Sequence, residues 1–248
     1  MQRRSSKSAA IYIPIGVLLI ILLTILGTSG FLRIMEIEVD GAVMYSDDEI
    51  IGASGISMGN HLFFIDSSAA ASRIEQVLPF INGVTVTRVP PGAVRIEVSE
   101  STALAFVVSA SEALIIDSSG RVLGRAGATP DDLIAIKGFT TGEIIEGSRL
   151  KAVQGGEYQL DIMLDILGAF EKEGMEKLVT YLDVTYITQI EFDYKIRYTV
   201  VLGGASNLKQ KLTSLPGAIE VVEKTYPQGV TGTLRAEPNG EWRFSSEK

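Results

Sequence analysis

Residues 35–41 read MEIEVDG, and apolar side chains at positions 35, 37 and 39 alternate with acidic ones before the glycine. This period of two predicts a strand with one buried face. The next stretch, Ser46-Asp47-Asp48-Glu49, places serine and glutamate at the spacing of a capping box. A short helix is therefore expected to begin at this point and to end near Gly55.

A second helix is predicted a few residues further along. Residues 58–60 have the composition of a turn, and Asp66 can cap a helix from Ser67 to about Leu78, before Pro79 stops it. The expected buried face of this helix consists of Ala70, Ile74, Val77 and Leu78. Apolar alternation then predicts strands around residues 84–86 and 94–98, joined by a turn at 90–92. The predicted order is β-α-α-β-β.

The segment that precedes this module is strongly apolar. Residues 9–32 contain no charged residue, and about 20 helical residues suffice to cross the bilayer core. The basic residues Arg3, Arg4 and Lys7 lie before the run, and no acidic residue accompanies them. We therefore expect a cytoplasmic basic tail at 1–8 and a transmembrane helix at 9–31, with the C-terminus on the extracytoplasmic side.

A cleaved signal peptide is the alternative to an anchor, with Gly27-Thr28-Ser29 as a tolerable cleavage site. The apolar run is longer than such peptides usually have, which favours the anchor. In both cases, residues 33–248 lie outside the cytoplasm. They carry 19 of the 22 basic residues and all 30 acidic ones. Such an acidic surface argues against nucleic-acid binding and is repelled by anionic lipid headgroups.

The sequence of the first module is similar to that of a POTRA domain, a small module to which other polypeptides bind. The similarity lies in a set of ordered motifs: residues 37–41, 46–50, 59–66, 74–79, 84–91 and 96–100. A POTRA domain directly behind one transmembrane helix and a short basic tail resembles the DivIB/FtsQ family of bacterial cell-division proteins. This resemblance extends over about residues 1 to 242.

The remainder of the chain predicts a second domain of mixed structure. An apolar run lies at 103–106, and two more at 115–116 and 122–123 flank a tight turn at 118–120. Another short run covers 134–139. Residues 159–173 have the best helical pattern, ended by Gly174. Further strands are expected at 178–184, 189–192 and 196–202.

The C-terminal part contains a second similarity to the family. A strand that ends in Leu202-Gly203 is followed by a helix from Leu208, which runs to Pro216 or resumes to Lys224. The last strand is predicted at 232–236, followed by a turn at 238–240 and the single tryptophan, Trp242.

The sequence offers no catalytic or metal-binding constellation. The absence of cysteine excludes disulfides, thiol nucleophiles and cysteine-ligated metals, and His61 is the only imidazole. We expect a structural or surface role for His61. The pairs Asp47-Asp48 and Asp131-Asp132 fit helix starts or loops, and Gly203-Gly204 fits a strand end. No catalytic, cofactor-binding or metal-binding residue is predicted, and no cofactor.

Binding through the backbone remains as the predicted activity. The last strand of an open sheet exposes N–H and C=O groups that a partner strand can complete. The resemblance implies that this C-terminal region binds the membrane-proximal segment of a small coiled-coil division protein of the FtsB/DivIC and FtsL type. The predicted partner-binding residues are Tyr226, Gly232, Thr233, Leu234, Arg235, Ala236 and Trp242. An acidic residue at position 234 is expected to abolish binding without unfolding the chain. The alternative is that Leu234 and Trp242 only pack on the core.

The sequence thus predicts an α+β protein: one N-terminal transmembrane helix, a β-α-α-β-β POTRA domain and a mixed α/β domain with a largely antiparallel sheet. The expected domain boundaries are 1–8, 9–31, 33–101, 102–226 and 227–248, the last being a C-terminal edge strand and tail. The resemblance implies a non-enzymatic, single-pass scaffold at the division septum, linked indirectly to the septal wall synthase complex.

Two other classes compete with this interpretation. One is a POTRA-bearing component of a protein translocation or secretion system, although its relatives end in a membrane β-barrel with long alternating strands. The second is an anchored cell-wall hydrolase, which would need a catalytic constellation. The short strands and strong helix of the distal part favour the scaffold.

Overall fold

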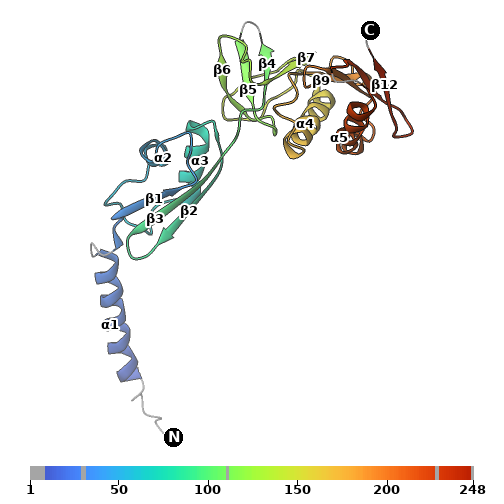
Figure 1. Ribbon diagram of the computed structural model, residues 1–248. Helices are drawn as coiled ribbons and strands as arrows, with labels where there is room; N and C mark the ends of the chain where they lie inside the picture. The colour runs from blue at the N-terminus through green and yellow to red at the C-terminus, as the bar shows by residue number, and fades with distance from the viewer. Residues whose placement is uncertain (1–8, 29–31, 110–111, 227–228, 247–248) are drawn as a thin grey trace. The chain divides into compact units, whose positions relative to one another are not determined.

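The computed structural model describes residues 9–28, 32–109, 112–226 and 229–246 (Figure 1). The chain divides into two compact units, Met1–Glu100 and Ser101–Lys248, called here the proximal unit and the distal unit. The predicted basic tail, residues 1–8, lies outside the described residues.

The first helix, α1, comprises Ala9–Thr28. The predicted span at 9–31 therefore extends beyond the described residues. Within the described ranges, the structure contains no helix that is both long and apolar enough to cross a membrane.

The proximal unit contains a three-stranded sheet with two helices, in the predicted order β-α-α-β-β. Its elements are β1 (Glu36–Asp40), α2 (Asp47–Ser54), α3 (Ser67–Val77), β2 (Ile81–Val89) and β3 (Ala93–Glu100). The strand order is β1-β3-β2, with β1 parallel and β2 antiparallel to β3. A core that includes Ile50, Leu62 and Ile96 joins the sheet to the helices.

The start of α2 is the predicted capping box. The backbone N–H of Glu49 donates to the Ser46 hydroxyl, and the Glu49 carboxylate accepts from the Ser46 backbone N–H at 2.9 Å. This backbone hydrogen bond, with a smaller effect of the Ser46 hydroxyl, lowers the pKa of Glu49. The ionised Glu49 side chain therefore stabilises the folded state fully above the pKa that glutamate has in the unfolded chain. This stabilisation is lost as the pH falls through the lowered pKa of Glu49 in the folded state.

Replacing Ser46 by alanine is expected to destabilise α2 by about 1 kcal/mol, because the N-cap acceptor is lost. The pKa of Glu49 should rise only slightly in the same variant, because alanine keeps the backbone N–H that lowers it most and removes only the hydroxyl. Hydrogen exchange of the α2 amides and an NMR titration of the Glu49 carboxyl group would measure the two effects. Unchanged exchange together with an unchanged pKa would show that the cap contributes nothing.

One residue of the predicted buried face of α3 is not buried. Ala70, Ile74 and Leu78 lie in the core, but Val77 is 61% exposed. The helix ends at Val77, and Leu78 has extended backbone angles that turn its side chain into the core instead. The helical period therefore no longer decides which side chain is buried at this end.

The distal unit is built on a nine-stranded sheet with the order β12-β11-β10-β9-β8-β7-β4-β5-β6. Its strands are β4 (Ala105–Ser109), β5 (Glu112–Ile116), β6 (Val122–Ala126), β7 (Ile134–Lys137), β8 (Tyr181–Asp183), β9 (Ile190–Tyr194), β10 (Tyr198–Gly203), β11 (Gly232–Ala236) and β12 (Trp242–Ser246). Five neighbouring pairs are antiparallel and three are parallel. The prediction of a mixed domain with a largely antiparallel sheet is therefore confirmed.

Two helices, α4 (Glu157–Lys172) and α5 (Leu208–Thr225), lie side by side against the sheet (Figure 1). The predicted helix at 159–173 is confirmed as α4, whose apolar side chains are buried from Ile162 to Phe170, and Gly174 follows with a positive φ of 66°. Helix α5 is continuous through Pro216, which resolves the two predicted lengths in favour of the longer one. One core joins both helices to the strands.

The predicted strand at 178–184 is much shorter in the structure. Only Tyr181–Asp183 pairs as β8, because the Asp193 carboxylate accepts hydrogen bonds from the backbone N–H groups of Thr180 and Tyr181 at 2.8 and 2.9 Å. A side chain thus replaces the strand partner at this end. The next hairpin turns at Lys195 and Ile196, both with positive φ, so β10 begins two residues later than predicted.

Candidate partner-binding site

The predicted last strand is not the edge of the sheet. Strand β11 matches the predicted range 232–236, but it lies between β10 and β12. Residues 239–240, Asn-Gly, turn the chain into β12, which pairs antiparallel with β11 from Trp242 to Ser246. The Asn-Gly pair is a strong hairpin signal. The edge strand at this side is therefore β12.

The register of the β11–β12 hairpin sorts its side chains onto two faces. Leu234 pairs with Phe244 and Ala236 with Trp242, on the face that α5 covers. Thr233 and Arg235 point to the other face, since side chains alternate along a strand. Leu234 is fully buried. The alternative interpretation, that Leu234 packs on the core, therefore holds for this residue.

A groove of about 570 Å³ lies between α5 and the end of this hairpin. Its walls are mainly apolar: Gly217, Ala218, Val221, Val222, Thr225 and Tyr226 from α5 and its end, and Leu234, Trp242 and Phe244 from the two strands. Ser214 of α5 and Glu241, directly before β12, add two polar side chains at its border. Val221 is 64% exposed and Tyr226 is 39% exposed. The groove therefore presents apolar surface to solvent directly beside the edge strand.

Aromatic contacts hold the groove in shape. The ring of Phe244 lies 4.8 Å from the ring of Tyr226 and 6.1 Å from that of Tyr198, measured between centroids. The indole N–H of Trp242 donates to the Ser214 hydroxyl at 2.9 Å. Gly232 packs directly against the Phe244 side chain, and a Cβ added at this position would come within 2.7 Å of the phenylalanine ring. Glycine is required there for the ring to remain in place.

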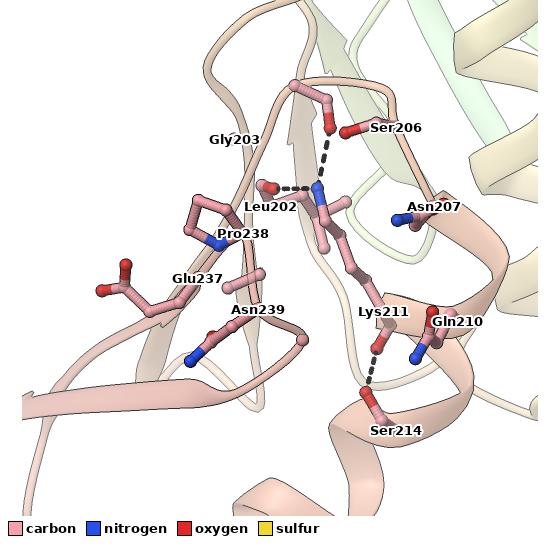
Figure 2. Close-up of a pocket in the computed structure, with 13 residues that line it drawn as sticks. Leu202, Gly203, Ser206, Asn207, Gln210, Lys211, Ser214, Glu237, Pro238 and Asn239 are labelled. Atoms are coloured by element: carbon pink, nitrogen blue, oxygen red, sulfur yellow. Dashed lines mark hydrogen bonds between the residues drawn. The ribbon is translucent and has the colours of Figure 1, made fainter.

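A smaller polar pocket of about 270 Å³ adjoins the groove, where β10 ends and α5 begins (Figure 2). The Lys211 ammonium donates to the carbonyl oxygens of Leu202 and Gly204 at 2.7 and 2.9 Å. Burial lowers the pKa of Lys211. Lys211 belongs to α5, Leu202 belongs to β10, and Gly204 directly follows that strand. This contact therefore fixes the start of the helix against the sheet.

The structure brings together three of the seven predicted binding residues. Tyr226, Leu234 and Trp242 line the groove, although Leu234 is covered. Gly232 contacts the Phe244 ring that forms part of the groove, and Ala236 lines the polar pocket instead. The prediction missed Val221 and Phe244.

One of the two missed residues, Phe244, had a recognisable signal. Trp242 and Phe244 alternate with Arg243 and Ser245 directly after an Asn-Gly turn, which is the pattern of a hairpin strand. Val221 lies on the predicted helix, but nothing local distinguishes an exposed valine from a buried one.

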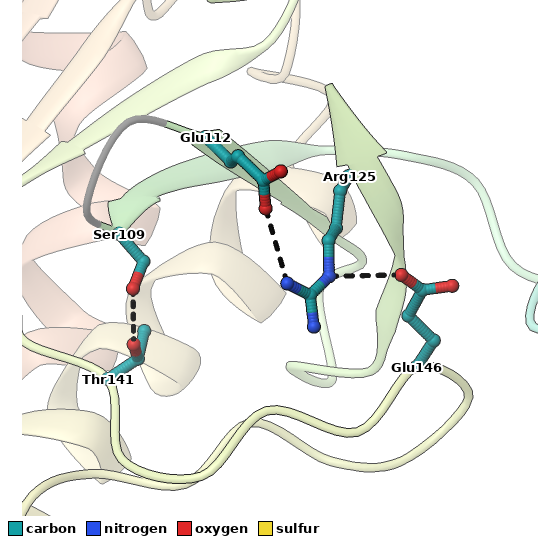
Figure 3. A network of polar contacts seen from close by, with 5 residues as sticks. All are labelled: Ser109, Glu112, Arg125, Thr141 and Glu146. Atoms are coloured by element: carbon teal, nitrogen blue, oxygen red, sulfur yellow. Dashed lines mark hydrogen bonds and ion pairs between the residues drawn. The ribbon is translucent and has the colours of Figure 1, made fainter. Parts of the chain in front are cut away.

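The opposite edge of the sheet, β6, is partly covered. The backbone of Val122 pairs with that of residues 147 and 148, through bonds of 2.8 and 2.9 Å. Arg125 then holds Glu146 at 3.1 Å and Glu112 at 3.2 Å, which ties the same loop to β6 and β5 (Figure 3). Among the described residues, no backbone group is bonded to the outer side of β12. The two edges thus differ in their availability for pairing.

His61 and the two aspartate pairs that were considered for catalysis lie at turns and at a helix start. The His61 ring stacks on Phe64 at 4.4 Å between centroids, and its Nδ1 accepts from the Phe63 backbone N–H. Asp47 and Asp48 lie in the first turn of α2, and Asp131-Asp132 forms a turn before β7. In the part of the chain that the structure describes, no group of three or more His, Asp or Glu residues could hold a metal ion.

Comparison with known proteins gives consistent similarities. Residues 32–101 match the family model described as "POTRA domain, FtsQ-type". A cell division protein FtsQ from Corynebacterium glutamicum is 32% identical over 136 residues, which cover 53% of this chain and 60% of that protein. A cell division protein DivIB from Clostridium botulinum is 26% identical over 224 residues, 90% of this chain and 84% of that protein.

The chain therefore spans less than two thirds of the first relative and most of the second. A solved structure of the major extracytoplasmic domain of the trans isomer of DivIB from Geobacillus stearothermophilus aligns over 52% of this chain and 99% of that chain. Its sequence identity is 14% and its TM-score is 0.33.

Proposed function

We propose that this chain, which belongs to the FtsQ/DivIB family of bacterial cell-division proteins, is a non-enzymatic scaffold of the division complex that captures a partner strand at β12. The open outer side of β12, beside an exposed apolar groove, is the observation that carries this proposal. The partners proposed are small coiled-coil division proteins of the FtsB/DivIC and FtsL type, which link the scaffold indirectly to septal wall synthesis.

Strand addition suits this edge for physical reasons. A partner strand that pairs with β12 satisfies backbone groups along the whole strand, and side chains on one face of that partner can enter the groove. Tyr226 and Trp242 are the residue types that most often dominate binding energy at interfaces. The covered start of β6 supports β12 as the preferred edge of the two.

The arginine side chains on β11 and β12 favour a partner segment that carries acidic residues. Arg235 and Arg243 are directly paired across β11 and β12 on the face opposite the groove, and like charges in such pairs repel each other. Arg243 has Glu237 at 3.2 Å, whereas among the described residues Arg235 has no ion pair. An acidic side chain on a partner strand beside Arg243 would reduce this repulsion.

The membrane anchor belongs to the same proposal. Residues 9–32 contain no charged residue. Within this run, the structure describes the side chains of residues 12–25. Leu18, Leu19 and Leu22 of α1 are all more than half exposed, as expected for side chains that contact lipid. We propose that this run crosses the membrane with the N-terminus in the cytoplasm, so that both units act outside it at the division septum.

Complementation tests the proposed function. Cells depleted of the protein should fail to divide, and the full chain should restore division. A chain that ends at Glu241 lacks β12 and should not restore division, although it should still be found in the membrane fraction. Normal septation of the depleted cells, or full rescue by the shortened chain, would contradict the proposal.

A further inference from the structure

The proximal unit exposes three large apolar side chains on one loop, residues 57–65. Met58 is 61% exposed, Phe63 is 52% exposed and Phe64 is 83% exposed, whereas Leu62 between them is fully buried. The loop is ordered by its own contacts, because Phe64 stacks on His61 and the Phe64 backbone N–H donates to the His61 carbonyl at 3.0 Å. The two rings are therefore presented to solvent by a folded loop.

This loop is tied to the residues that follow α1. The backbone N–H of Leu62 donates to the Leu32 carbonyl at 2.8 Å, and that of Ile34 donates to the Asn60 carbonyl at 2.9 Å. The Arg33 guanidinium donates to the Gly59 carbonyl at 2.8 Å. The loop and the start of the proximal unit thus form one structure.

Chain length then limits how far the loop can lie from the end of α1. Leu32 is four residues beyond Thr28, so an extended chain places it at most about 14 Å from the helix end. This limit holds at any angle between α1 and the sheet. If α1 spans the bilayer core, the loop lies within reach of the headgroup region, where aromatic side chains are commonly found.

The charge of the loop also differs from that of the rest of the protein. Residues 33–248 carry 30 acidic and 19 basic residues, whereas the loop itself, residues 57–65, contains no acidic residue and no lysine or arginine. Arg33 and Arg88 contact the loop, the latter by a bond of 2.6 Å to the Ile65 carbonyl. Bilayer surfaces that contain anionic lipid favour this combination of basic and aromatic residues.

We propose that loop 57–65 inserts Phe63 and Phe64 into the headgroup region of the leaflet from which α1 emerges, so that the proximal unit is held on the membrane surface at two points. The occupant of this apolar surface is the phospholipid bilayer. This inference rests on the anchor in the proposed function. The loop acts as a second contact, distinct from the partner-binding groove of the distal unit.

Lipid quenching of a single fluorophore tests the inference in the full chain. The chain has no cysteine, so Ser57→Cys, Val43→Cys and Leu19→Cys each provide one labelling site. Ser57 belongs to the loop, whereas Val43 is 90% exposed beyond the opposite end of β1. Each variant is labelled with nitrobenzoxadiazole and reconstituted into vesicles of phosphatidylcholine and phosphatidylglycerol.

Nitroxide lipids spin-labelled near the headgroup should quench the label at position 57 about twofold more than the label at 43. The added changes Phe63→Ser and Phe64→Ser should bring the quenching at 57 down to that at 43, since both side chains are exposed and the backbone hydrogen bonds that tie the loop to residues 32 and 34 do not use them. Nitroxides deep in the bilayer should quench the label at 19.

The possible failures can be separated. Deep quenching at 19 with equal quenching at 57 and 43 overturns the lipid contact and leaves the anchor standing; the loop would then face a protein partner. Loss of deep quenching at 19 overturns the anchor itself, and the loop contact with it. Strong quenching at 57 that survives the two serine substitutions overturns the role of the phenylalanines.

Discussion

Replacing Leu234 by aspartate is expected to unfold the distal unit, although this residue lies in the strand next to the binding edge. Leu234 has no exposed surface and packs in the core with residues of α5. The substitution removes a buried leucine side chain and introduces a carboxylate that has no partner there. We expect a loss of more than about 3 kcal/mol in the free energy of unfolding.

Denaturant unfolding of the distal unit, followed by the fluorescence of Trp242, would measure this loss in the purified chain. Arg235→Asp is the matched control, because Arg235 is the next residue and its side chain is exposed. It should change stability by only a few tenths of a kcal/mol. A folded Leu234→Asp variant that fails only to bind would restore the expectation that Leu234 is a contact residue.

Replacing Val221 by glutamate is expected to weaken partner binding without affecting the fold. Val221 lies on the exposed side of α5, and glutamate is a good helix former. A charge in the wall of the groove would have to be desolvated when a partner side chain enters. We expect a loss of about 2 kcal/mol, roughly a thirtyfold rise in the Kd for the partner.

Val108→Glu provides the control for this binding measurement. Val108 is also an exposed valine of the distal unit, 54% exposed compared with 64% for Val221, but it lies on β4, far from β12 in the strand order. Titration calorimetry with the membrane-proximal segment of the coiled-coil partner would compare the two variants. Equal affinities of the Val221→Glu and Val108→Glu chains would exclude the groove as part of the interface.

The sequence predicted the parts of the fold that depend on local chemistry. The capping box at Ser46 and Glu49 acts within one helical turn, and the terminator Gly174 follows its helix directly, so both could be recognised from spacing alone. The order of elements in the proximal unit follows from such signals. The family similarity was likewise visible in the spacing of its motifs.

Features that depend on pairing between distant residues were predicted less well. Whether Gly232–Ala236 forms an edge depends on the strand that follows it, and the short, partly exposed β12 was read as a tail. The shortening of β8 depends on Asp193, a side chain of the next strand. The burial of Leu234 and the exposure of Val77 are likewise decided by tertiary packing.

The candidate site shows the same division. Its place near the C-terminus and the two aromatic residues Tyr226 and Trp242 were predicted from sequence, but the groove itself arises only when α5 packs beside the hairpin. Arg235 and Thr233 were included because they lie in the same strand, whereas side-chain alternation turns them to the other face. The alternation along β11 would have separated the side chains that face α5 from those on the opposite face, if the sequence had shown which face α5 covers.

Disulfide crosslinking from β12 tests the central claim most directly. Ser245 is exposed on the edge strand, and Ser245→Cys would be the only thiol in the chain. It is combined in living cells with single cysteines placed in turn along the membrane-proximal segment of the coiled-coil partner. Strand addition predicts crosslinks at every second partner position. Crosslinks at helical spacing, or none from Ser245 while the two proteins still co-purify, would contradict the account.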